Sequence, residues 1–214
     1  MRHRVIGVLA AIAFAACSSV AAHATVYTNS GGTQSTLHPF GSPDTTNYGE
    51  YFTAPGGALD SWTFWSQSVV TAGNLELVVA SWNGTSAVGP ALYTSAPIAD
   101  SGASNEALIF SGINLALTTG QSYIAYMTVA GVTGPVAGAS IATSSTDVLN
   151  GGGVFDNSNG ANPLTSGSNT WTISGVYFTY SATFGPAAVP EPTGAAVLAF
   201  GLIGLGLVRR RPSR

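Results

Sequence analysis

From Val5 to Val208 this chain of 214 residues contains no lysine and no arginine, and this gap restricts its folding more than any other feature. The only cysteine, Cys17, lies near the start. A domain formed by residues 25–188 therefore has no disulfide and no salt bridge to lysine or arginine. Apolar packing, hydrogen bonds and buried aromatic rings must stabilise it instead.

The pattern of residues between these ends predicts β-strands throughout. Valine, isoleucine, threonine and aromatic residues fill short runs, and glycine, asparagine, serine and proline separate them. Asn83-Gly84 indicates a tight turn. We expect one domain, residues 25–188, with an all-β fold: a single antiparallel β-sandwich of the jelly-roll type. A β-solenoid is the alternative, but the sequence has no fixed repeat period. The expected strands are 48–53, 59–66, 75–82, 91–95, 107–110, 122–129, 140–143, 170–174 and 176–184.

Two stretches of low complexity lie on either side of the central part of the body. They are 28–35 and 150–169, and the second predicts a long surface loop. Within it, Asp156-Asn157-Ser158-Asn159-Gly160 carries enough oxygen atoms to suggest calcium. Because Gly160 falls at position five where an EF-hand has it at six, we favour an ordinary turn and expect no metal site.

The N-terminal segment has the three parts of a secretory signal peptide. Arg2 and Arg4 supply positive charge, residues 5–16 are apolar, and Ala22-His23-Ala24 predicts cleavage before Thr25. A lipoprotein-type cut at Cys17 is a minor alternative. We therefore expect residues 1–24 to direct export across the inner membrane through the Sec translocon.

The C-terminal segment also has three parts. Val189-Pro190-Glu191-Pro192-Thr193 precedes an apolar run from Gly194 to Val208, and the basic residues Arg209, Arg210 and Arg211 follow it. Basic residues beside an apolar segment favour the cytoplasmic side of a membrane. The run of 15 residues spans roughly 22 Å as a helix, which is short for a hydrocarbon core of about 30 Å. We expect residues 189–214 to form a transient transmembrane sorting helix, which proteolysis then removes.

This order of elements resembles the PEP-CTERM sorting signal of Gram-negative bacteria, which an exosortase is thought to recognise near the Pro-Glu-Pro motif. The same tail is also catalogued as an ice-binding protein C-terminal domain, but as an address it implies nothing about the body. The resemblance implies a protein that is secreted or held at the cell surface, linked to exopolysaccharide and biofilm. Three segments of the body, 51–55, 82–85 and 89–95, resemble other secreted proteins of unassigned function that carry this tail.

Charge and catalytic groups limit the functions available to the body. Residues 25–188 contain eight carboxylates and no lysine or arginine, so their formal charge is −8, and phosphate neutralisation in a nucleic-acid complex is excluded. We expect these carboxylates to form a solvated acidic surface. His38 is the only histidine of this region. Because the sequence has no nucleophile elbow for a catalytic triad and the region has no cysteine for a zinc site, we expect His38 to be an ordinary loop residue. Glu50 and Glu76 are candidates for a glycosidase pair, although nothing in their spacing selects them. We expect no enzyme and no cofactor.

Aromatic side chains are the remaining candidates for binding. Trp62 and Trp65 differ in parity, so on a regular strand one faces the core and the other faces solvent. An outward tryptophan can stack on sugar rings, and we name Trp65 and Trp82 as possible glycan contacts. The expected function is that of a non-catalytic surface or matrix protein, structural or glycan-binding. The alternative is a secreted hydrolase that uses carboxylates on polysaccharide.

Overall fold

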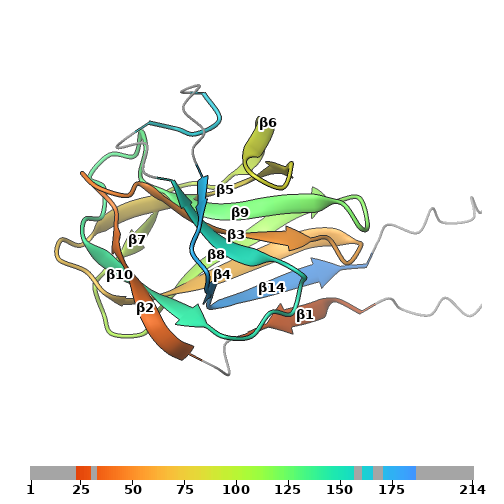
Figure 1. Ribbon diagram of the computed structural model, residues 1–214, viewed down its shortest axis with the longest axis horizontal. Coiled ribbons are helices and arrows are strands. Elements are labelled where there is room, and N and C mark those ends of the chain that lie inside the picture. The colour runs from red at the N-terminus through yellow and green to blue at the C-terminus, as the bar shows by residue number, and fades with distance from the viewer. Residues whose placement is uncertain (1–22, 30–32, 157–160, 166–170, 187–214) are drawn as a thin grey trace, which may run out of the picture.

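The computed structural model describes residues 23–29, 33–156, 161–165 and 171–186. Over these ranges the chain forms fourteen β-strands in two antiparallel sheets of seven strands each (Figure 1). The described part contains no helix, and hence none that could cross a membrane. The predicted signal peptide and the predicted sorting helix both lie outside the described residues.

The first sheet is built around the long strand β4. Its order is β1-β14-β4-β10-β13, with β8 paired to the free side of β4 and β2 paired to β10. The strands are β1 (Thr25–Thr28), β2 (Thr33–Phe40), β4 (Ala58–Ser68), β8 (Glu106–Ala116), β10 (Ala139–Ser144), β13 (Tyr177–Phe178) and β14 (Tyr180–Gly185).

The second sheet is centred on β9 and has the order β12-β11-β3-β9-β5-β6, with β7 paired to β5. The strands are β3 (Asn47–Thr53), β5 (Gly73–Trp82), β6 (Ala87–Thr94), β7 (Ile98–Asp100), β9 (Ser122–Thr128), β11 (Gly152–Asp156) and β12 (Trp171–Ile173). Every predicted strand overlaps one of these fourteen, and 176–184 divides into β13 and β14. The Asn83-Gly84 turn is present, with Gly84 at a φ of 101°.

The predicted surface loop 150–169 is wrong over residues 152–156, which form β11. This strand pairs with β3 and β12, and Gly152, Gly153 and Val154 are buried. Glycine normally weakens a strand, but here the backbones approach closely. A Cβ atom at Gly153 would collide with the carbonyl oxygen of Val176, and one at Gly151, just before the strand, would collide with that of Tyr51. The run of glycines at 151–153 is therefore explained by close packing of the backbone at the start of β11.

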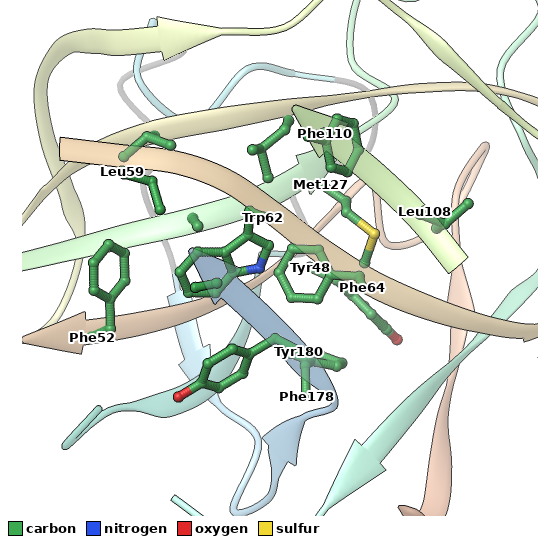
Figure 2. Packing of buried hydrophobic residues seen from close by; sticks show 14 of the residues in the cluster. Tyr48, Phe52, Leu59, Trp62, Phe64, Leu108, Phe110, Met127, Phe178 and Tyr180 are labelled. Atoms are coloured by element: carbon green, nitrogen blue, oxygen red, sulfur yellow. The ribbon is translucent and has the colours of Figure 1, made fainter. Parts of the chain in front are cut away.

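The main core lies between the two sheets and is rich in aromatic rings. Trp62 of β4 stacks on Tyr180 of β14, with ring centroids 4.9 Å apart, and it meets Phe52 of the second sheet at 5.0 Å (Figure 2). Alternation along β4 turns Trp62 and Phe64 inward, and both side chains are fully buried. Tyr123 and Tyr126 lie three residues apart, so they occupy opposite faces of β9 and belong to separate clusters.

The two ends of the described domain lie side by side. Thr25 of β1 is paired with Phe184 of β14, so the chain enters and leaves at the same end of the strands (Figure 1, right). We call this end the near pole. It also includes the loops 54–57 and 117–121, which are joined by hydrogen bonds such as the one from the amide of Gly120 to the carbonyl of Ala54. The opposite end, formed by loops 41–46, 69–72, 101–105 and 129–138, is called the far pole.

Candidate functional site: the outer face of the first sheet

The outward side of the first sheet presents an uncharged surface across four adjacent strands. Because Trp62 and Phe64 point into the core, alternation turns Ser61, Thr63 and Trp65 outward on β4. The same argument applies on the neighbouring strands. The surface, called the hydroxyl face below, consists of Val26, Thr28, Ser61, Thr63, Trp65, Ala107, Ile109, Ser111, Ser181 and Thr183.

The register arranges these side chains in two rows that cross the strands. One row runs Val26–Thr183–Ser61–Ser111, and the next runs Thr28–Ser181–Thr63–Ile109. Neighbouring strands lie about 4.8 Å apart, and side chains on one face recur about every 6.6 Å along a strand. The hydroxyl groups therefore form a shallow grid, to which Val26 and Ile109 add apolar surface, being 59% and 58% exposed.

Most hydroxyl groups of this face are available to a ligand. Thr28 donates to the carbonyl of Tyr180 at 3.1 Å. The other five hydroxyl groups form no hydrogen bond within the described part of the chain; they belong to Ser61, Thr63, Ser111, Ser181 and Thr183. Each can act as donor and acceptor, as a sugar hydroxyl requires.

Trp65 continues the face beyond the two rows, toward the far pole. Its cross-strand neighbour on β8 is the small, exposed Ala107. The side chain is partly exposed, and across the described ranges its ring is in contact with no other aromatic ring. The structure thus confirms the predicted parity, with Trp62 inward and Trp65 outward.

Trp82, the second tryptophan named from the sequence, lies in a different environment. It points away from the main core on β5 but is only 6% exposed. Its ring stacks on Tyr51 at 5.4 Å with an interplanar angle of 7°, and Trp171 meets it edge-on at 6.1 Å. These rings belong to a second apolar cluster on the outer side of the second sheet, against which Leu164 also packs. Protein contacts therefore occupy the ring of Trp82.

The structure separates the candidate carboxylate pair. Glu50 and Glu76 lie on strands that flank β9, where they pair with Ala125 and Thr128 respectively. Ala125 faces the main core, and Thr128 has the opposite parity. The two side chains consequently project from opposite faces of one sheet and cannot flank a single glycosidic bond.

The expectation of a solvated acidic surface is wrong for three of the eight carboxylates. Glu50, Asp100 and Asp156 each have an exposed fraction of 0%. Burial is the largest effect on Glu50 and raises the pKa of its carboxyl group well above the usual value. The amide of Phe178 donates to Oε2 at 2.9 Å and lowers this pKa, whereas the charge of Asp147 raises it. A protonated carboxyl group is the form that this apolar position favours.

Asp100 and Glu106 form a neighbouring pair that sequence reasoning missed. Burial raises the pKa of Asp100, whereas hydrogen bonds, first of all from the hydroxyl of Ser101 at 2.7 Å, lower the pKa of Glu106. The amides of Ser101 and Ala103 also donate to Glu106, and the amide of Gly102 donates to Asp100. The two carboxyl groups thus fix loop 101–105, and the burial of Asp100 keeps it from a substrate.

The remaining candidates, Asp156 and His38, lie on different strands, β11 and β2. Asp156 is buried and pairs with Asn47 and Trp171 across the strands, while 157–160 lie outside the described residues. No group of three or more His, Cys, Asp or Glu side chains in the described part is placed to hold a metal ion. His38 is exposed, and it lies in strand β2 instead of the expected loop.

The sorting residues fall almost entirely outside the described ranges. Thr25 begins β1 and Ala24 precedes it, whereas Ala22, the motif 189–192 and the arginines 209–211 are not described. A scan against protein-family models, a search of curated proteins and a search of solved structures found no match to this chain.

Proposed function

We propose that this chain is an exported, non-catalytic surface or matrix protein that binds an uncharged polysaccharide through the hydroxyl face. Its two packed sheets form a β-sandwich of the jelly-roll type, and this face lies on the outer side of one sheet. An exosortase would recognise the tail and release the domain at the cell surface or into the extracellular matrix. The ligand would be an exopolysaccharide of the biofilm.

The observation that carries the proposal is the combination of Trp65 with five free hydroxyl groups on one regular sheet. A tryptophan ring stacks on the apolar face of a sugar, and hydroxyl side chains exchange hydrogen bonds with its polar edge. Apolar side chains within the grid exclude water from the contact. A long polysaccharide suits an open face of this kind, because successive sugars meet successive rows.

The charge of the domain favours an uncharged ligand. Residues 25–188 carry a formal charge of −8 and no lysine or arginine, so a polysaccharide rich in uronic acids would be repelled. None of the ten side chains of the hydroxyl face is ionisable. Binding would accordingly depend little on salt, in contrast to recognition through ion pairs.

Binding is tested on matrix polysaccharide extracted from cells that make the protein, separated into neutral and uronate-rich pools. We expect retention by the neutral pool and at least a tenfold weaker affinity for Trp65→Ala, as loss of about 1.4 kcal/mol of stacking implies. Trp65→Phe should recover part of this affinity. Ile173→Ala removes an apolar side chain that is 62% exposed on the other sheet and serves as the control.

Two results would overturn this part of the proposal. Equal binding of Trp65→Ala and the parent protein would place the ligand elsewhere. Degradation of the polysaccharide into shorter chains would favour the alternative, a secreted hydrolase.

The sorting route is tested separately by the intact mass of the exported protein. We expect a mature chain that begins at Thr25 and ends near the 189–192 motif, and a longer chain that stays in the membrane when the exosortase is deleted. An exported species that still carries Arg214 would contradict cleavage of the tail.

A further inference from the structure

We infer that the near pole of the domain rests against an anionic lipid surface while the tail is uncut, with the carboxylate-rich far pole directed away from the membrane. This inference rests on the proposed sorting role of residues 189–214. It adds an orientation of the domain and names the surface that contacts the lipid headgroups.

The pairing of the first and last described strands places the membrane tether at the near pole. Thr25 lies opposite Phe184, so the mature N-terminus and the start of the tail share this end. Seven residues, 187–193, separate the described domain from the apolar run. Fully extended, they reach at most about 25 Å, so the near pole stays close to the membrane surface.

The near pole is suited to this position because its loops are uncharged. Residues 54–57 and 117–121 contain no ionisable side chain, and Thr118, Thr119 and Gln121 are exposed. Anionic headgroups such as phosphatidylglycerol carry negative charge, and these two loops, which contain no carboxylate, meet them with little repulsion. Asp60, beside Gly185, and Asp147 are the acidic groups in this half of the domain.

Five of the eight carboxylates lie at the other end of the strands. Cross-strand register places Glu76 opposite Thr128, Asp100 opposite Gly73, Glu106 opposite Ser66 and Asp156 opposite Asn47, and Asp44 lies in loop 41–46. The 11 residues of β4 separate the poles by roughly 35 Å. In the second sheet the 7 residues of β3 give roughly 23 Å, so the five carboxylates lie about three to four Debye lengths of about 8 Å from the near pole and are screened from the membrane.

The orientation also determines how the hydroxyl face is presented. Strand β4 runs from Ala58 at the near pole to Ser68 at the far pole, so its outward residues form a wall that stands on the membrane. Trp65 lies near the end that points away from the lipid. A matrix polysaccharide therefore reaches Trp65 before the tail is cut.

The test is energy transfer from single labels to a fluorescent lipid headgroup. Cys17 lies in the leader, so residues 25–214 contain no cysteine and accept one label at a chosen site. Thr119→Cys marks the near pole and Ser104→Cys the far pole; both side chains are exposed. The proteins are bound to phosphatidylethanolamine–phosphatidylglycerol vesicles. We expect a greater loss of donor fluorescence from residue 119 than from residue 104, and equal or reversed losses would overturn the orientation.

A charge variant adds a second measurement on the protein labelled at residue 119. Thr118→Glu with Gln121→Glu should lower the energy transfer, because new carboxylates meet anionic headgroups. Thr71→Glu with Ser104→Glu adds the same charge at the far pole and should leave the transfer unchanged. An equal effect of both pairs would contradict the inference. Flotation with the vesicles is followed in parallel, and failure of the parent protein to float would refute the role of the tail itself.

Discussion

The outer faces of the two sheets arise from the same alternation of side chains but differ in what covers them. On the first sheet the outward side chains are small hydroxyl residues around a partly exposed Trp65. On the second sheet the outward side chains include Trp82, Tyr126 and Val154, which form a buried cluster with Leu164 packed against it. Parity decides which way a side chain points, whereas its accessibility depends on segments from elsewhere in the chain.

The largest difference that we expect between the two faces is in how much stability is lost when Trp82 or Trp65 is replaced. Trp82→Ala removes a ring that Tyr51 and Trp171 contact, and we expect a loss of about 3–5 kcal/mol in the free energy of unfolding. Trp65→Ala should cost about 1 kcal/mol, because the ring is partly exposed and has no aromatic partner in the described part. Urea unfolding of both variants measures the difference. Similar losses would show that the two faces are not distinct.

Between the faces, the buried Glu50 should make stability depend on pH. Its pKa is higher in the folded than in the unfolded chain, so the folded state retains the proton over a range of pH above about 4.5. The free energy of unfolding should therefore fall as pH rises through this range, by about 1.4 kcal/mol for each unit between the two pKa values. Burial raises the pKa of Asp100 also, which adds a change of the same sign.

Glu50→Gln should reduce this decline, since the amide stays neutral at every pH. Glu76→Gln makes the same change on the opposite and partly exposed side of the same sheet and is the matched control. Denaturation midpoints between pH 4 and pH 9 supply the comparison. An unchanged slope for Glu50→Gln would show that another group causes the pH dependence.

The smallest expected effect concerns single hydroxyl groups. Thr63→Val keeps the shape of a residue at the centre of the hydroxyl face and removes its hydroxyl, so polysaccharide affinity should fall about fivefold, equivalent to one hydrogen bond of about 1 kcal/mol. Thr94→Val makes the same change at an exposed position of β6 on the second sheet and should leave affinity intact. If the two variants bind alike, the grid of hydroxyl groups does not recognise the ligand.

Local pattern predicted much of the fold, and contacts between distant segments account for the rest. The strands, the Asn83-Gly84 turn and the inward position of Trp62 follow from residue types and alternation. Strand β11 escaped prediction because its glycines are required by the close approach of distant segments, the ring of Tyr51 at Gly152 and the carbonyl oxygen of Val176 at Gly153. The burial of Glu50 could not be predicted from the sequence either, because it depends on the packing of the second sheet against β13, the strand of the first sheet that contains Phe178.

The most direct test of the hydroxyl face uses the indole N–H signals of the four tryptophans, Trp62, Trp65, Trp82 and Trp171, in nuclear magnetic resonance spectra. Each signal is assigned by substitution to phenylalanine, and the neutral polysaccharide pool is then titrated into the protein. We predict that the Trp65 signal shifts with saturation while the other three stay in place. A shift of Trp82 or Trp171 with an unchanged Trp65 would place binding on the second sheet and contradict the proposed function of the first.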